Sequence, residues 1–461
     1  QRNSEATKYG EVPENMLTKE RQFRADISHL EQTLFKDKTD NQSLKDSLFS
    51  VKNKYQNYLT TIEKSHPKYY ALKYKSDVVS LKKMQAEMQD NQLFLSYLVA
   101  DEVLFLTTIE NNKKAFYKLP FSQKTKNLIT KLYKKSAKID INDPSIYKDS
   151  YAVYKSILAP ILSKTKATDL TICADDILNY LPFDALMTSD ENQDYLLKSH
   201  AISYTSSATL FVEQSKKRNT KKSKLLVFAP KFTETTTVSH DRNNFSPLIY
   251  NEQEAKNISQ YFSGTVYNGN NASIVNFKKE LATHNLLHFA THASANDAFP
   301  DYSYLAFSDD KKTSNLLYVK DIYNYQINAD LVTLSACETG VGKLQKGEGM
   351  MSLARAFNYA GVPSIVTTLW KINDQSTSEI MEYFYKNLYN GLSKKEALRQ
   401  AKLSYLELCD DPILKHPYYW SGIVLTGNTD PVASKSMLIW LLLGTFVLIL
   451  IRAVVRKRKA K

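Results

Sequence analysis

Two residues with the chemistry of a nucleophile and its base each follow a strand-like segment of this chain. The apolar, β-branched run 331–334 leads to Cys337, and the run 285–289 leads to His292. If these strands are neighbours, both side chains lie at the same edge of a sheet. A thiolate is a strong nucleophile, and a nearby imidazole makes it available near neutral pH. The spacing therefore predicts a Cys–His dyad.

The surroundings of Cys337 suit covalent catalysis. A glycine-rich loop follows it, so another backbone can come close to the sulfur. The backbone N–H groups of Cys337 itself and of Ala293, directly after the histidine, could bind an oxyanion. Cys173 and Cys409 lack such a setting, and we expect them to pack within a strand and a helix end. Because buried free cysteines are common, a structural role for Cys337 also stays open on the residues alone.

Three histidines recur at a spacing of four, which on a helix would place three metal ligands on one face. They are His284, His288 and His292. However, the segment 286–290 has a strand pattern, no HExxH motif is present and no carboxylate is placed to complete a site. We therefore expect neither a metal nor an organic cofactor. His288 is predicted to be a packed residue or one that supports the dyad.

The elements that would position the dyad alternate between strands and helices along the second half of the chain. This alternation predicts an α/β sheet flanked by helices, with the chemistry at the carboxyl ends of its strands. Strands are expected at 93–99, 103–109, 115–119, 170–173, 225–229, 286–290, 304–307, 331–335, 364–369 and 422–425. Helices are expected at 122–136, 145–162, 252–262, 273–283, 319–325, 348–360, 375–390 and 393–408.

The first part of the chain, 1–91, has a different pattern. Apolar residues recur with a helical period in 17–35 and 43–62, and a third helix is expected after Ser76. No self-similarity at a period of 34 residues is detectable. This region is either the degenerate end of a tetratricopeptide-like array or a plain helical hairpin.

Composition narrows the function classes. A chain of 461 residues with 43% hydrophobic and 11% aromatic residues can bury a real core. The formal net charge is +13, but lysine and glutamate are interleaved and no RNA- or DNA-binding motif accompanies the charge, so we expect no nucleic-acid partner. Three widely separated cysteines without a CxxC pair fit neither a disulfide framework nor a zinc site.

The carboxyl terminus carries a long apolar segment. The run 437–451 is uninterrupted, and 436–455 is close to the length that spans a bilayer, with a basic tail at 456–461. These features predict a single-pass membrane protein with a cytoplasmic tail and the bulk of the chain on the extracytoplasmic side. Gln1 is not an initiator Met, which fits removal of a signal peptide or an upstream domain.

An ordered set of motifs adds a family resemblance. The motifs are LPFDAL (181–186), SSA (206–208), LHFATHA (287–293), LSACETG (334–340), GEG (347–349), ARAF (354–357), VTTLW (366–370) with Asp374, and YWSGI (419–423). Together they resemble the CHAT domain, a group of caspase-like cysteine peptidases related to separases, over residues 92–430. The resemblance implies a caspase-like sheet, preceded here by the helical region and followed by the expected membrane span.

The resemblance also implies roles for the site residues. His292 would be the general base and Cys337 the nucleophile of peptide-bond hydrolysis. The family often has glycine after this histidine, whereas Ala293 adds a methyl group beside the oxyanion pocket. Acidic Glu338 and Asp374 near the inferred cleft would favour a basic residue before the cut. Relatives carry tetratricopeptide repeats upstream as the partner-binding part.

The sequence thus predicts a membrane-anchored, caspase-like cysteine endopeptidase that cuts protein or peptide substrates. An activating protein would bind through the helical region. The alternative is a catalytically idle CHAT-like scaffold for protein–protein interaction. A third hypothesis, an anionic-lipid or nucleic-acid binder driven by net charge, would show steep salt dependence and indifference to loss of Cys337.

Overall fold

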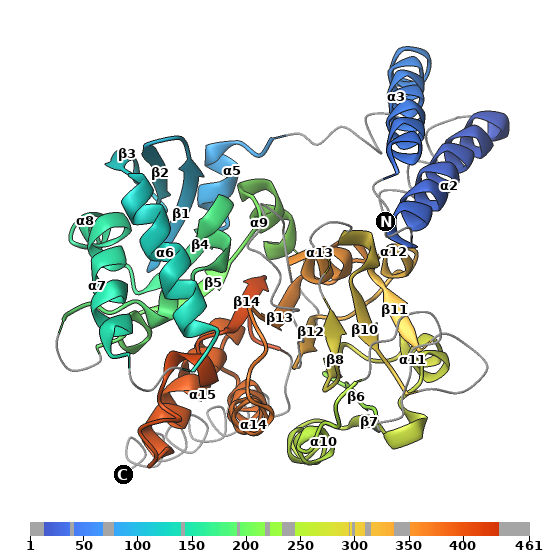
Figure 1. Ribbon diagram of the computed structural model, residues 1–461. Helices are drawn as coiled ribbons and strands as arrows, with labels where there is room; N and C mark the ends of the chain where they lie inside the picture. Colours follow the sequence, from blue (N-terminus) through green and yellow to red (C-terminus); the bar gives the residue numbers. More distant parts are fainter. Residues whose placement is uncertain are drawn as a thin grey trace, which may run out of the picture. The chain divides into compact units, whose positions relative to one another are not determined.

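The computed structural model describes eleven stretches of the chain (Figure 1). They are residues 13–36, 41–67, 78–139, 143–190, 194–216, 222–232, 245–294, 296, 300–308, 315–335 and 351–432. The chain divides into two compact units, 1–78 and 79–461, and each is considered by itself. The sequence-based domain boundary at residue 91 stays a prediction.

The first unit contains two antiparallel helices, α2 (Glu14–Lys36) and α3 (Gln42–Ser65). The ring of Phe23 lies against those of Tyr55 and Tyr58, with centroid distances of 5.8 and 5.4 Å. These contacts join the apolar stripes that the helical period predicts. Within the described residues, this unit is a helical hairpin.

The second unit alternates strands and helices and contains the segments that precede the predicted site residues. Its strands are β1 (Gln92–Val99), β2 (Val103–Ile109), β3 (Lys114–Pro120), β4 (Asp169–Cys173), β5 (Ala201–Tyr204), β6 (Leu225–Ala229), β7 (Gly264–Asn268), β8 (Leu286–Phe289), β9 (Ala293–Ser294), β10 (Tyr304–Ala306), β11 (Leu316–Tyr318), β12 (Leu331–Leu334), β13 (Ser364–Thr368) and β14 (Ile423–Gly427). Its α-helices are α5 (Leu81–Ala86), α6 (Gln123–Ser136), α7 (Ser145–Ile157), α8 (Ala159–Leu162), α9 (Ala208–Ser215), α10 (Asn251–Ser259), α11 (Ile274–Glu280), α12 (Val319–Ile322), α13 (Met351–Tyr359), α14 (Asp374–Tyr389) and α15 (Lys394–Leu408).

Eleven of these strands form one mixed sheet, in the order β3-β2-β1-β4-β5-β14-β13-β12-β8-β6-β7. Strands β1, β4, β5 and β14 are parallel to one another, and so are β13, β12, β8, β6 and β7. The two blocks meet antiparallel at β13 and β14. A second, small sheet has the order β11-β10-β9. The predicted α/β fold, a large sheet flanked by helices, is confirmed.

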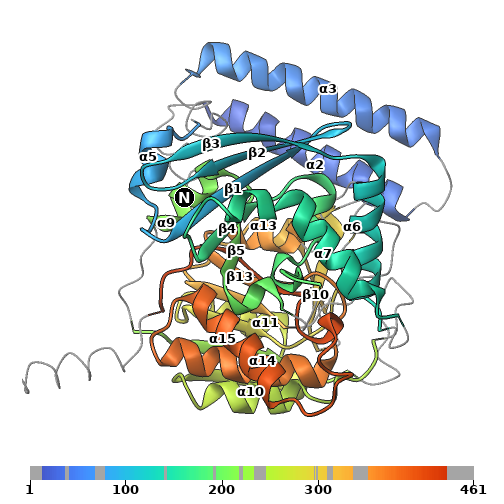
Figure 2. The same cartoon turned by 90° about the vertical axis from the view of Figure 1, so that its left-hand side faces the viewer.

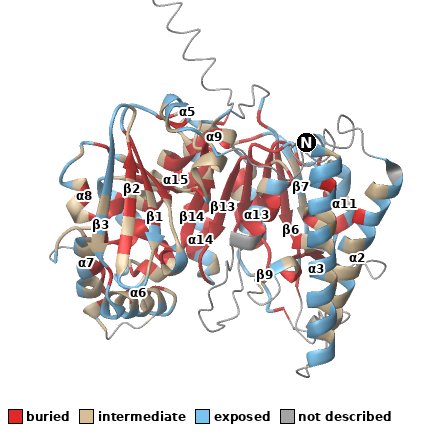
Figure 3. Cartoon of the chain, turned by 90° about the horizontal axis from the view of Figure 1, so that it is seen from above, coloured by how far each residue is buried: buried red, intermediate tan, exposed pale blue. Residues whose placement is uncertain are grey.

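Helices cover both faces of the block that carries the predicted dyad (Figures 1 and 3). On one face α10 and α14 bury residues such as Ile258 and Phe384 against the strands, and α15 packs beside α14. On the other face α11 and α13 contribute Phe277 and Phe357. Strands β13, β12, β8 and β6 are buried along their whole length, which is why their sequences are largely apolar rather than alternating, whereas the edge strand β7 is partly exposed.

The other block is built in the same way around β1. Leu93, Leu95 and Tyr97 of this strand belong to the core formed with α6 and α7. The intervening Phe94 points to the opposite face and packs with Phe211 of α9. Figure 2 shows the two helix pairs on the two sides of β1, with α5 beside α9. Because successive side chains of a strand point to opposite faces, β1 packs against one helix layer on each side.

The predicted membrane localisation requires correction. No helix among the described residues is long and apolar enough to cross a bilayer. The expected span at 436–455 and the basic tail at 456–461 lie outside those residues. An uninterrupted apolar run has the length and composition of a membrane span, but these two properties do not by themselves establish a spanning helix. The single-pass membrane assignment is accordingly withdrawn.

A buried ion pair connects the LPFDAL motif to the last long helix. Lys402 of α15 is 2% exposed, and its ammonium bonds to a carboxylate oxygen of Asp184 and to the carbonyl of Ile423. The pair therefore ties the loop before β5 to α15 and to the first residue of β14. Removing one partner of a buried pair leaves the other charge without compensation, which costs about 3–5 kcal/mol.

We expect Lys402→Met to lower the free energy of unfolding by about 3–5 kcal/mol because Asp184 would be left buried and unpaired. The double variant Asp184→Asn/Lys402→Met should regain much of this loss. Urea denaturation of the full chain measures both values. The control is Lys198→Met, which removes an exposed pair with Asp194 and should cost less than about 1 kcal/mol. Equal effects of Lys402→Met and Lys198→Met would contradict the assigned role.

Candidate active site

The strands that precede the predicted dyad are parallel neighbours in the sheet. β12 pairs with β8 so that Leu331 lies opposite Leu286 and Leu334 opposite Phe289. One residue further, the N–H of Ser335 donates to the carbonyl of Phe289 at 2.9 Å. The carboxyl ends of the two strands are therefore level, at the edge where parallel α/β sheets hold their sites.

His292 follows the end of β8 and is 2% exposed. Its Nε2 donates to the backbone carbonyl of Ser246 at 2.7 Å. The rings of Phe232 and Phe245 flank the imidazole, with centroid distances of 4.8 and 5.2 Å. Because a carbonyl only accepts, the proton of the neutral ring resides on Nε2, and Nδ1 carries the lone pair that can take a proton. Packing and hydrogen bonding thus fix both the plane and the tautomer of this ring.

The segment 245–250, which we name the strap, supplies both Phe245 and the Ser246 carbonyl. At its other end, the N–H groups of Ile249 and Tyr250 donate to Oδ2 of Asp374 at 2.9 and 2.8 Å. Asp374 is the first residue of α14. The predicted substrate-binding carboxylate is therefore also the anchor of the loop that holds His292, and its role toward substrate stays a prediction.

The backbone after His292 enters the small sheet, which determines the direction of the N–H of Ala293, whose role as an oxyanion donor stays a prediction. The N–H of Ala306 in β10 donates to the carbonyl of His292 at 2.8 Å. The next residue, Ala293, faces Leu305 in the antiparallel ladder. Hydrogen-bonded and non-hydrogen-bonded pairs alternate along such a ladder, so the N–H of Ala293 points away from β10. β9 is the edge strand of this small sheet, which leaves that N–H directed outward.

Cys337 and Glu338 lie outside the described residues, and so does the N–H of Cys337 that was predicted as the second oxyanion donor. Both described cysteines are half-buried, at the strand end and the helix end where the sequence places them. Cys173 is the last residue of β4, and burial raises the pKa of its thiol, which disfavours the thiolate. Cys409 follows the last residue of α15.

A buried polar cluster beneath the two strand ends was not foreseen from the sequence. Glu254 of α10 is 1% exposed, and its Oε1 accepts from Nε2 of His288 at 2.7 Å and from Oγ of Ser335. The hydroxyl of Tyr385 contacts Nδ1 of His288 at 3.1 Å and donates to Oγ1 of Thr333 at 3.2 Å. A sequence signal for it existed, because Glu254 shares its helical face with the apolar Ala255 and Ile258.

The three histidines at a spacing of four have separate partners. His284 bonds to Thr265 and Thr283, His288 to Glu254, and His292 to the strap. In the part of the chain that the structure describes, no group of three or more His, Cys, Asp or Glu side chains could hold a metal ion.

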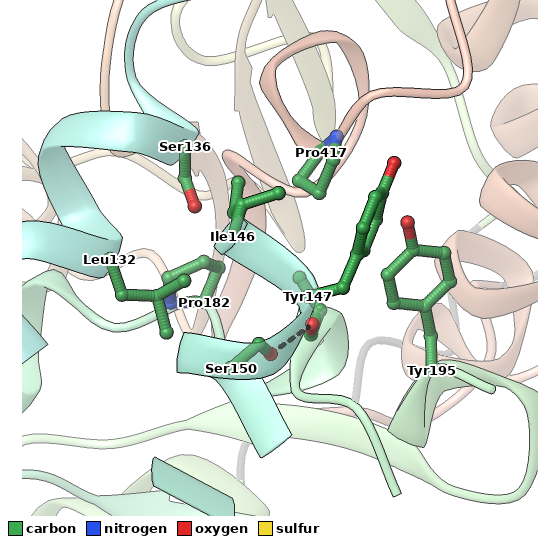
Figure 4. A pocket seen from close by; sticks show the side chains of 9 residues that line it. Leu132, Ser136, Ile146, Tyr147, Ser150, Pro182, Tyr195 and Pro417 are labelled. Atoms are coloured by element: carbon green, nitrogen blue, oxygen red, sulfur yellow. Dashed lines mark hydrogen bonds between the residues drawn. The ribbon is translucent and has the colours of Figure 1, made fainter. Parts of the chain in front are cut away.

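A small cavity lies beside α6 and α7, and none of the residues that line it belongs to the candidate site. It is lined by Leu132, Ser136, Ile146, Tyr147, Ser150, Pro182, Ala185, Tyr195 and Pro417 (Figure 4). The bond drawn there joins Oγ of Ser150 to the carbonyl of Ala185. Its volume is about 10 Å³, the space of a single water molecule, so it cannot admit a peptide side chain.

Comparisons with known proteins agree with this architecture. The family model described as the CHAT domain matches residues 148–428. Tetratricopeptide repeat protein 28 of Homo sapiens is 24% identical over 315 residues, which cover 59% of this chain and 12% of that protein. Its counterpart in Mus musculus is 28% identical over 124 residues, covering 27% and 5%. The chain therefore spans only a small part of the length of these relatives.

Two solved structures are similar in fold. The Saccharomyces cerevisiae separase–securin complex matches with a TM-score of 0.48 and 12% identity, covering 85% of this chain and 34% of that chain. Gingipain R of Porphyromonas gingivalis, an Arg-specific cysteine proteinase, matches with a TM-score of 0.37 and 9% identity, covering 67% and 74%. With TM-scores below 0.5, these similarities do not by themselves assign an activity.

We expect Asp374→Ala to loosen the strap, because both of its anchoring N–H groups would lose their acceptor. Hydrogen exchange followed by mass spectrometry should show exchange at Ile249 and Tyr250 accelerated about tenfold or more. Asp374→Asn keeps an acceptor oxygen and should stay nearer to the wild type. Gln375→Ala, which removes only an exposed bond to Glu379, is the matched control. Unchanged exchange in Asp374→Ala would show that the carboxylate does not hold the strap.

Proposed function

Since the chain belongs to the CHAT domain family, we propose that it is a cysteine endopeptidase with His292 as general base and Cys337 as nucleophile. The observation that carries this proposal is the pairing of β8 with β12, whose carboxyl ends lie at the same height in the sheet. The hydrogen bond from the N–H of Ser335 to the carbonyl of Phe289 continues this pairing beyond the strands. Cys337 is two residues beyond Ser335, and two residues of chain extend at most about 7 Å. We therefore propose that the thiol lies close to the strand that leads to His292.

The state of His292 suits the first chemical step. Its Nε2–H is committed to the Ser246 carbonyl, so Nδ1 is the atom that accepts the thiol proton. The resulting thiolate attacks the carbonyl carbon of the scissile bond, and the charge moves to the carbonyl oxygen. We propose that the N–H groups of Ala293 and Cys337 donate to this oxyanion.

Collapse of the tetrahedral intermediate breaks the C–N bond, and the proton on His292 leaves with the amine. Water, deprotonated by the same imidazole, then hydrolyses the thioester and regenerates the thiol. The carbonyl of Ser246 stabilises the imidazolium in both half-reactions, since it accepts from the N–H that faces away from the reaction. No step in this scheme requires a metal or an organic cofactor.

For substrate choice we propose a basic residue before the cut, recognised by Glu338 and Asp374. A carboxylate has about four lone-pair sites. The two bonds from the strap to Oδ2 of Asp374 therefore leave acceptor capacity and the full negative charge for a substrate cation. A protein partner that binds the helical hairpin would act as the activator.

The second candidate function is a protein-interaction scaffold in which the dyad is idle. What favours it is the similarity to curated relatives named as tetratricopeptide repeat proteins, of which the match covers 12% or less. A CHAT-like unit can serve assembly rather than cleavage, because a fold does not fix an activity.

We expect the purified full chain to cleave members of a mixed peptide library after Arg or Lys. Cys337→Ala and His292→Ala should each reduce kcat by about a thousandfold or more, because the two residues act as one unit. Cys173→Ser should cleave like the wild type. Mass spectrometry of the products measures both the rate and the cut sites.

A thiol-reactive peptide probe separates a resting enzyme from a scaffold. Labelling of Cys337 that depends on His292 supports the peptidase even before an activator is found. If no cleavage occurs and the probe labels Cys337 equally in the wild type and His292→Ala, the peptidase proposal fails and the scaffold remains.

A further inference from the structure

One carboxylate oxygen contacts both of the strands that lead to the proposed dyad. Oε1 of Glu254 accepts from His288, inside β8, and from Ser335, directly after β12. These partners are 34 and 81 positions away in the chain, so no local sequence requirement brings the three groups together. Their convergence is a property of the tertiary fold.

A second set of hydrogen bonds, further from the carboxyl end of β12, also joins β8 to β12. Tyr385 of α14 joins His288 of β8 to Thr333 of β12 through its hydroxyl group. Burial raises the pKa of Tyr385, and the negative charge of Glu254 adds to this effect, so the hydroxyl keeps its proton. The strands are thus tied at two levels, at Thr333 and at Ser335.

A buried charge in this place is costly unless it is partnered, and packing alone would be achieved more cheaply by an apolar side chain. The environment is otherwise apolar, with Ala255, Ile258 and Phe384 buried nearby. What the carboxylate adds is a fixed orientation of the side chains that donate to it. It fixes the side chain of Ser335, while the bond to Phe289 fixes the backbone of the same residue.

The two residues that donate to Glu254 are close in sequence to the proposed dyad. Ser335 is two residues before Cys337, and His288 is four residues before His292. We propose that Glu254 is a positioning residue, which sets where the chain leaves β12 relative to β8 and so the distance from the nucleophile to its base. This inference rests on the proposed peptidase function. Glu254 acts through Ser335 and does not itself contact the substrate.

The test compares links at the two levels of the cluster in the full chain. Ser335→Ala removes the upper link, Ser335→Thr restores a hydroxyl, and Glu254→Gln keeps length and an acceptor but not charge. Tyr385→Phe removes the lower link, further from Cys337, and is the matched control. The rate of Cys337 alkylation by iodoacetamide is measured against pH by peptide mass spectrometry, together with kcat and KM for a cleaved peptide.

We expect Ser335→Ala and Glu254→Gln to move the midpoint of the alkylation profile toward that of an ordinary thiol, about 8.5. They should lower kcat about tenfold to a hundredfold with little change in KM. The reason is that a displacement of about 1 Å between reacting groups can slow a reaction about a hundredfold. Ser335→Thr should recover most of the loss, and Tyr385→Phe should leave the profile unchanged. A purely structural role would instead give Ser335→Ala and Tyr385→Phe the same profile.

The outcomes separate this inference from the function on which it rests. If alkylation depends on His292 in the wild type but Ser335→Ala and Glu254→Gln leave it unchanged, the positioning role is wrong and the peptidase stands. If the wild type already reacts like an ordinary thiol, whether or not His292 is present, both proposals are overturned.

Discussion

The level pairing of β8 with β12 is the constraint on which the rest of the site depends. Parallel strands without a register shift bring their carboxyl ends to one edge, and here the bond from Ser335 to Phe289 extends the ladder one residue beyond the strands. His292 and Ala293 follow β8 directly, so the end of this strand determines where both residues lie. A slip of one residue would turn Ser335 away from Glu254 and end the cluster.

Around this edge, several elements far apart in the sequence hold a single imidazole. The strap supplies a stacked ring and a carbonyl acceptor, and Asp374 at the start of α14 anchors the strap. Asn251, the first residue of α10, donates to the carbonyls of Pro230 and Ala290 and so joins α10 to the end of β8. The same helix carries Glu254. α10 and α14 therefore serve the site as well as the core, which explains why their inward faces are not uniformly apolar.

Much of this arrangement could be predicted from the sequence, because buried parallel strands have strong apolar runs. The segments 225–229, 286–289 and 331–334 are such runs, and each forms a buried strand as predicted. β5 and β7 were missed because neither is an apolar run: β5 has the sequence AISY, and β7 is an edge strand that begins with glycine and ends with asparagine. A strand of two residues, β9, has no periodicity to detect.

The supporting residues were harder to foresee than the dyad. Glu254, Ser246 and Asp374 act through contacts with residues that are distant in sequence, and no spacing rule reveals such a contact. The membrane assignment was wrong, since no helix among the described residues is long and apolar enough to cross a bilayer.

The central claim is that His292 and Cys337 are neighbours, and a short bifunctional alkylating reagent tests it without a substrate. Treatment of the full chain with 1,3-dibromoacetone, followed by trypsin, should join the peptide 280–311 to the peptide 321–343 through His292 and Cys337. Fragmentation distinguishes His292 from His284 and His288 in the same peptide. The cross-link should vanish in His292→Ala. Single alkylation of Cys337 with no cross-link to His292 would contradict the account.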